Sequence, residues 1–152
     1  MDFIFVTILG ALWGSFANVC ILRLPEDKGV VVGRSFCPNC KKLIIWKDNI
    51  PIISFLLLKG KCRQCKKPIS LQYTLVEILS LISFLSIYYY YGISITTLLL
   101  IILALIFIII FFIDLKHFII PNTLTFPLMA LGFIKSFIPN LDEIFPNYID
   151  SL

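Results

Sequence analysis

Thirty-six consecutive residues, 78–113, contain no charged side chain. An uncharged apolar segment of this length is unusual in a soluble domain, whereas a membrane-spanning helix needs about 20 such residues. Four consecutive tyrosines at 88–91, followed by Gly92, divide the segment in two. Tyrosine favours the membrane interface, and glycine permits a tight reversal of the chain. The segment therefore predicts two spans, at about 75–90 and 95–113.

Two further apolar segments predict spans before and after this pair. Residues 3–22 form one, and residues 122–138 form a shorter one that is interrupted by Pro127. Hydrophobic residues make up 59% of the chain, which is more than a soluble core of this size can bury. The predicted fold class is an all-α polytopic membrane protein with about four transmembrane helices.

Positive charge is concentrated between the first and second predicted spans. Eleven of the thirteen Lys and Arg residues lie in 23–67. Such a cluster is also typical of nucleic-acid binding, but the flanking spans make the positive-inside rule the better explanation. We therefore expect no nucleic-acid partner and place this segment on the cytoplasmic side of the lipid bilayer. Alternation of the spans then places Asp114 on the same side and the acidic tail, 139–152, on the other.

Two Cys-x-x-Cys pairs lie inside the basic segment. Cys37 and Cys40 form the first pair, and Cys62 and Cys65 form the second after twenty-one intervening residues. This pattern predicts a tetrahedral zinc site, because each pair places two thiolates on one tight turn. Disulfides are the alternative, but a cytoplasmic loop is in a reducing compartment. A structural zinc ion would stabilise 23–73 as a small loop domain, for which we expect two zinc knuckles with short strands.

Several other residues are candidates for a functional role. Gly60 is expected to form a turn that lets backbone amides approach the thiolates or a ligand. Asp114 follows the uncharged segment and is a candidate for a functional role, although Lys116 and water could also satisfy it as an ordinary helix-end carboxylate. His117 is better explained as an interfacial imidazole than as a general base. Glu77 is interpreted as a carboxylate that favours a helix N-terminus.

The first predicted span carries two kinds of special position. Gly10 and Gly14 form a small face that allows another helix to approach closely. Ser15 and Asn18 are polar and need a partner, which could be another helix or a ligand.

Six blocks of the sequence together resemble the type IV prepilin leader peptidases. They occur in the family's order over nearly the whole chain up to about Pro127. The blocks are GSFANVCILRLP at 14–25, SFCPNC at 35–40, WKDNIP at 46–51, GKCRQC at 60–65, IS at 69–70 with Tyr73 and Glu77, and ID at 113–114 followed by IPN at 120–122.

The resemblance implies a bacterial inner-membrane aspartyl peptidase that is also an N-methyltransferase. Such an enzyme removes the leader from prepilins or pseudopilins and methylates the new N-terminus from S-adenosylmethionine, with Gly60 in the methyl-donor region. Pilus or type II secretion assembly proteins are implied partners. Asp114 would be one catalytic carboxylate, and the family's second lies in a Gly-x-Gly-Asp motif that does not occur in this sequence. We therefore expect the chain to be the front portion of a longer enzyme.

Two alternatives stay open. The chain could be a partial enzyme that needs a second chain for the missing aspartate, or a noncatalytic zinc-bearing membrane module that binds prepilin or pilus-assembly proteins. The expected division is a first span at 1–22, the zinc loop at 23–73, the remaining spans at 74–138, which begin the peptidase domain, and the acidic tail at 139–152.

Overall fold

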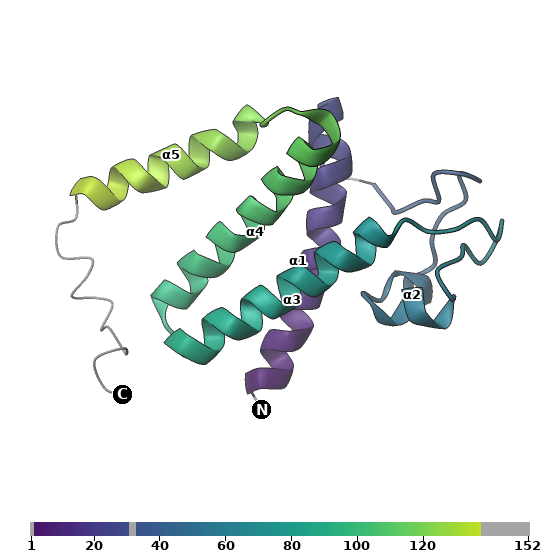
Figure 1. Cartoon of the computed structure of the whole chain (residues 1–152), viewed down its shortest axis with the longest axis horizontal. Coiled ribbons are helices and arrows are strands. Elements are labelled where there is room, and N and C mark those ends of the chain that lie inside the picture. Colours follow the sequence, from purple (N-terminus) through teal and green to yellow (C-terminus); the bar gives the residue numbers. More distant parts are fainter. Residues whose placement is uncertain (1, 31–32, 138–152) are drawn as a thin grey trace.

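The protein consists of long helices with an irregular loop lying to one side of them (Figure 1). The computed structural model describes residues 2–30 and 33–137, so the predicted acidic tail and the last residue of the fourth predicted span lie outside the described residues. The α-helices are α1 (Asp2–Arg23), α2 (Ile53–Leu57), α3 (Leu71–Tyr91), α4 (Ile95–His117) and α5 (Asn122–Phe137). Two short 3-10 helices, η1 (Leu24–Glu26) and η2 (Trp46–Asn49), lie in the loop region.

Three helices of the described part, α1, α3 and α4, are long and apolar enough to cross a membrane. They correspond to the first three predicted spans, and Gly92 ends α3 with a φ of +60°, as the predicted reversal requires. The fourth prediction corresponds to α5, whose described part has 16 residues and contains Pro127. Within the described residues, α5 is not among the helices long and apolar enough to cross a membrane.

Helices α1 and α3 form the closest contact of the bundle. A Cβ atom at Gly14 would lie 2.7 Å from the Cα of Glu77, and one at Gly10 would lie 2.9 Å from the Cα of Leu81. Only glycine allows the two backbones to approach this closely. The small face expected from the sequence is therefore the contact surface with α3.

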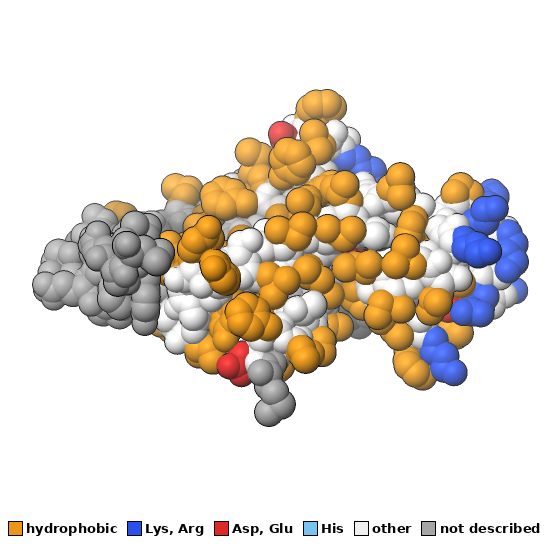
Figure 2. All heavy atoms as spheres, turned by 60° about the horizontal axis from the view of Figure 1, so that its bottom comes forward, with side chains coloured by type: hydrophobic (Ala, Val, Ile, Leu, Met, Phe, Trp, Pro, Cys, Tyr) orange, Lys and Arg blue, Asp and Glu red, His pale blue; other side chains and the backbone are white. Residues whose placement is uncertain are grey.

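The core lies where α1, α3 and α4 meet. Its buried members are apolar, and they are Ala17, Cys20, Ile21, Val76, Phe84, Leu105, Ile109, Phe112 and Ile113. Many large apolar side chains of the same helices are exposed, such as Phe5, Leu12 and Phe107. Figure 2 shows these apolar side chains spread over the helices, while most visible Lys and Arg side chains gather at the end that carries the loop. This distribution suits helices surrounded by lipid.

The loop between α1 and α3 has little regular structure. Within its described residues, the expected short strands are replaced by two isolated antiparallel bridges, Phe36 with Leu43 and Lys61 with Pro68. Each bridge closes a tight turn around one cysteine pair, and the turn is too short for a longer ladder. The expectation of short strands was therefore wrong, whereas two cysteine turns are present.

Candidate functional site

The two cysteine pairs sit on turns of the same construction. In the first, the Cys37 N–H donates to the carbonyl of Lys42 (3.0 Å) and the Lys41 N–H donates to the carbonyl of Cys37 (2.9 Å). The second repeats this pattern with Cys62, Lys67 and Lys66 at 2.9 and 3.0 Å. Lys41 and Lys66 both have a φ close to +60°, which tightens each turn. Each pair of thiols is thereby held on one side of its turn.

The four thiols meet in one cluster. The sulfur atoms of Cys37, Cys40, Cys62 and Cys65 all lie within 4.8 Å of one another, and those of Cys37 and Cys65 are 3.9 Å apart. Zinc–sulfur bonds of about 2.3 Å in a tetrahedron place neighbouring sulfurs about 3.8 Å apart. The cluster therefore fits a tetrahedral ion such as zinc.

The two thiols of the second turn, Cys62 and Cys65, differ in pKa. The N–H groups of Cys65 and Gln64 point toward the sulfur of Cys62 and lower its pKa to about 7. The Lys67 N–H lowers the pKa of Cys65, but desolvation and the neighbouring thiols outweigh it and raise that pKa to about 11. Backbone amides thus favour a thiolate at Cys62, the form that binds a metal.

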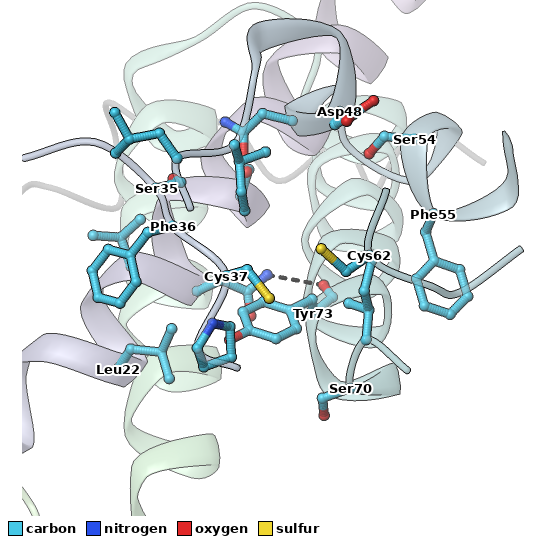
Figure 3. A pocket seen from close by; sticks show the side chains of 18 of the residues that line it. Leu22, Ser35, Phe36, Cys37, Asp48, Ser54, Phe55, Cys62, Ser70 and Tyr73 are labelled. Carbon is cyan, nitrogen blue, oxygen red and sulfur yellow. Dashed lines mark hydrogen bonds between the residues drawn. The ribbon is translucent and has the colours of Figure 1, made fainter. Parts of the chain in front are cut away.

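A cavity of about 850 Å³ adjoins the cysteine cluster. Cys37 and Cys62 contribute to its wall, and Asn18, Tyr73 and Glu77 contribute from α1 and α3. In Figure 3, Cys37 and Cys62 point toward one another, and Tyr73 lies close to them. The cavity therefore lies between the candidate metal centre and the α1–α3 contact.

Asn18 joins α1 to the start of α3 at this cavity. Its side-chain Nδ2 donates to the carbonyl of Tyr73 (2.9 Å) and to the carbonyl of Gly14 (3.3 Å). The first of these bonds is the dashed line in Figure 3. Asn18 is only 4% exposed, and its Oδ1 has no hydrogen-bond partner among the described residues. The polar group expected to need a partner is thus only partly satisfied by α3.

Glu77 joins α3 to the loop. Its Oε2 accepts a hydrogen bond of 2.8 Å from the backbone N–H of Ile52. Ile52 has φ 62° and ψ −52°, and the Ile53 N–H donates to the carbonyl of Pro51. This is a γ-turn of the rare, strained type, and it is unusual for a β-branched residue. Interpreting Glu77 from the sequence as a helix-end charge therefore missed its role as the acceptor for this turn.

The wall of the cavity is braced by an ion pair. Arg63 donates to both carboxylate oxygens of Asp48 at 2.6–3.0 Å, and the side chain of Asp48 is only 9% exposed. The hydrogen bonds from the Arg63 guanidinium lower the pKa of Asp48. Because Arg63 lies between Cys62 and Cys65, this pair fixes the second cysteine turn to η2.

Two predicted site residues lie away from the cavity wall. Gly60 has a φ of +67° and packs behind Phe55, whose ring would lie 3.0 Å from an added Cβ; Phe55 lines the cavity and Gly60 does not. Asp114 lies in the last turn of α4, where it is exposed, and it too is outside the set of lining residues. The structure thus brings together the four cysteines but not Gly60 or Asp114.

The match to known proteins covers this same region. A family model for the bacterial Peptidase A24 N-terminal domain matches residues 8–91, which is more than half of the chain. The chain belongs to this family. The match begins in α1 and ends with α3, so it includes the cysteine cluster and every described residue that lines the cavity. Together with the relatives described next, this match confirms the resemblance to prepilin leader peptidases at the level of the family.

Curated relatives of this family member carry the name prepilin leader peptidase/N-methyltransferase. The protein from Myxococcus xanthus is 37% identical over 91% of the chain and 42% of its own length. The proteins from Vibrio cholerae and Klebsiella pneumoniae are 37% and 38% identical over 88% and 86% of the chain and 57% and 60% of their own lengths. The chain thus spans about half the length of these relatives. No solved structure matches the chain.

Proposed function

We propose that this chain takes part in the two reactions for which its relatives are named, leader removal from prepilins and N-methylation of the new N-terminus. The proposed N-methylation is supported by one observation, the cavity of about 850 Å³ between the cysteine cluster and the α1–α3 contact. This cavity lies inside the segment that the family model matches. The peptidase half rests on the family and on the position of Asp114.

S-adenosylmethionine is the methyl donor that we assign to the cavity. The volume lies in the range of about 300–1,000 Å³ that is usual for small-molecule and cofactor sites. Its wall combines the aromatic side chains of Phe36, Phe55 and Tyr73 with the buried polar groups of Asn18 and Glu77. When bound, the donor supplies an electrophilic methyl group, and the residues of this chain hold and orient it.

Zinc is the ion that we assign to the four cysteines, in a structural role. Four thiolates complete a tetrahedral shell and leave no open position for a water molecule, unlike catalytic zinc sites. Because Cys37 and Cys62 line the cavity, the ion would fix one of its walls. The metal is thus proposed to support methylation indirectly, by holding the loop in place.

Asp114 is proposed as one carboxylate of an aspartyl peptidase pair. Such a mechanism needs two carboxylates around one water molecule, with one ionised and the other protonated. The second is proposed to come from polypeptide outside this sequence or from another chain. The exposed position of Asp114 at the end of α4 is suitable for a basic leader that stays in water while the apolar pilin helix stays in lipid.

The location proposed for this protein is a bacterial inner membrane, with the loop and Asp114 on the cytoplasmic side. Support comes from the eleven Lys and Arg residues between 23 and 67. Ile113, next to Asp114, is buried in the same cluster as Ile21 near the end of α1, and the two helix ends lie close together in Figure 1. The loop and Asp114 therefore share one side of the bundle.

A methyl-transfer assay tests the proposal. The zinc-loaded chain, reconstituted in lipid nanodiscs, is mixed with methyl-labelled S-adenosylmethionine and a pilin peptide that lacks the leader. We expect label on the peptide N-terminus, loss of transfer in Cys37→Ser, and transfer within about twofold of the original in Cys20→Ala, a cysteine outside the cluster. Peptide binding without any transfer by the folded, zinc-loaded chain would refute methylation and favour the noncatalytic module.

A further inference from the structure

Asn18, one of the residues that line the cavity, carries a hydrogen-bond acceptor that has no donor among the described residues. The Nδ2 of Asn18 is occupied by two carbonyls, so this amide is oriented with Oδ1 as its remaining group. That oxygen is buried and has no donor among the described residues. Leaving a buried acceptor without a donor is energetically costly. A ligand group with N–H donors would remove this cost.

Glu77 adds a carboxylate to the same cavity. The residue is 8% exposed and lines the cavity together with Asn18. The Ile52 N–H occupies Oε2, and the hydroxyl of Ser15 also faces the carboxylate. Both of these donors are neutral, so they do not balance a charge.

The other carboxylates of the cavity wall are balanced by cations. Glu26 pairs with Lys28, and Asp48 pairs with Arg63. Glu77 forms no ion pair within residues 2–30 and 33–137. A buried carboxylate without a cation is costly, and an ionisable residue inside a membrane helix bundle points to a functional site. The wall therefore has one carboxylate whose counter-ion is not supplied by a described side chain.

We propose that Asn18 and Glu77 form a binding site for the primary ammonium group of a ligand in this cavity. An ammonium has three donors and no acceptor, which matches a carboxylate and an amide oxygen on one wall. Its positive charge would balance Glu77. The inference rests on the proposed methylation for the choice of ligands, but the site itself follows from these two side chains.

Two ligands of that reaction carry a primary ammonium. One is the amino-acid portion of the methyl donor, and the other is the free N-terminus of the acceptor peptide. The strained turn at Ile52 places the loop directly against Glu77, so either ligand would meet loop residues at this point. The two sources can be separated by blocking one amine at a time.

Binding measurements on the zinc-loaded chain in nanodiscs test the site. In the first arm, calorimetry compares S-adenosylhomocysteine with its N-acetyl derivative. In the second, it compares an apolar peptide with a free N-terminus with the same peptide N-acetylated. We expect the free amine to bind at least about tenfold more tightly in one arm, which identifies the source. Equal affinity, or no binding, in both arms would overturn the proposal.

Substitutions test which residues cause the preference for the free amine over the acetylated probe. Glu77→Gln keeps the size of the side chain and an oxygen for the Ile52 N–H, and should reduce the preference for the free amine to within about twofold. Asp27→Asn, the corresponding change at an exposed carboxylate that does not line the cavity, should leave it intact. A preference that survives Glu77→Gln would remove Glu77 from the site. If Glu77→Gln lost helicity or zinc, the comparison of free and acetylated probes on the unsubstituted chain would still decide whether an ammonium site exists.

This test is separate from the assay for methylation. Amine-dependent binding without methyl transfer would support the ammonium site and refute the proposed reaction. Methyl transfer with equal binding of free and acetylated probes would support the proposed reaction and refute the ammonium site.

Discussion

Glu77 and Ile52 are twenty-five residues apart in sequence, and one hydrogen bond of 2.8 Å joins them across the boundary between α3 and the loop. Glu77 also lies where α1 and α3 are closest, opposite Gly14. One residue therefore contacts a transmembrane helix on one side and the loop that carries the cysteines on the other. Because Glu77 belongs to both, a substitution that alters the α1–α3 contact is expected to alter the cavity as well.

Gly14→Ala is expected to destabilise the bundle by about 1–3 kcal/mol, because the new methyl group would overlap the backbone of α3. The matched control is Gly132→Ala in α5, where an added Cβ has no neighbour within 4 Å. That change should be neutral or slightly stabilising through helix propensity. Reversible unfolding in detergent would measure both, and equal stability of Gly14→Ala and the unsubstituted chain would contradict the close contact.

Each of Cys37→Ser, Cys40→Ser, Cys62→Ser and Cys65→Ser is expected to lower zinc content from about one ion per chain, since a structural site needs all four ligands. Cys20→Ala should retain full zinc, because Cys20 is buried in the helical core. Metal analysis of purified protein checks both. Stable disulfides without metal under reducing conditions would show that the cluster is not a zinc site.

The Asp48–Arg63 pair predicts a pH dependence of the loop. Because Arg63 lowers the folded-state pKa of Asp48, the pair contributes its stabilisation above the ordinary carboxyl value of 3.8. The contribution is lost as the pH falls through the lower folded value. In Arg63→Gln, the Asp48 pKa should rise toward 3.8, as followed by NMR of labelled aspartate. An unchanged Asp48 titration in that variant would show that the pair does not form in solution.

Asp114→Asn is expected to abolish leader cleavage by a form extended through a Gly-x-Gly-Asp segment, because one carboxylate cannot act as both acid and base. The 152-residue chain alone should not cleave. A prepilin cleavage assay with zinc content as the control for folding would decide. Retained cleavage by the Asn variant would exclude Asp114 from the mechanism, and cleavage by the short chain would refute the assignment of the pair.

Labelling of single cysteines introduced at Lys28, Gly92 and Lys116 tests the sidedness. The first and last should react only from the cytoplasmic face, and the second only from the opposite face, because Gly92 lies between α3 and α4. The five native cysteines require a background with low reactivity, for which the zinc-loaded chain is suitable. Labelling of Lys28→Cys from outside would invert the proposed topology.

The helices and the cysteine cluster were predictable, because both depend on patterns that are local in sequence. The uncharged segment 78–113 and the repeated Cys-x-x-Cys spacing required no knowledge of tertiary contacts. The bounds of α5 agree with the predicted 122–138 over the described residues, but apolar composition alone did not decide whether a short helix that contains Pro127 crosses the bilayer.

The role of Glu77 depends on tertiary contacts and so was not visible in its local sequence. Its acceptor role follows from a positive φ at Ile52, a conformation that isoleucine rarely adopts. A signal did exist in the opposite helix. Gly14 and Asn18 are four residues apart, as are Tyr73 and Glu77, which would place each pair on one helix face. Assuming that these two faces contact each other would have predicted that Glu77 lies at the cavity.

The strained turn at Ile52 also predicts an order in which parts of the chain fold during synthesis. The ribosome completes the loop before it completes α3, so the turn is made before the carboxylate that accepts its N–H exists. A turn of this kind costs about 1–3 kcal/mol and persists only when its surroundings hold it. We therefore expect the cysteine turns to form early, whereas the segment between them should adopt its final shape only after α3 lies beside α1.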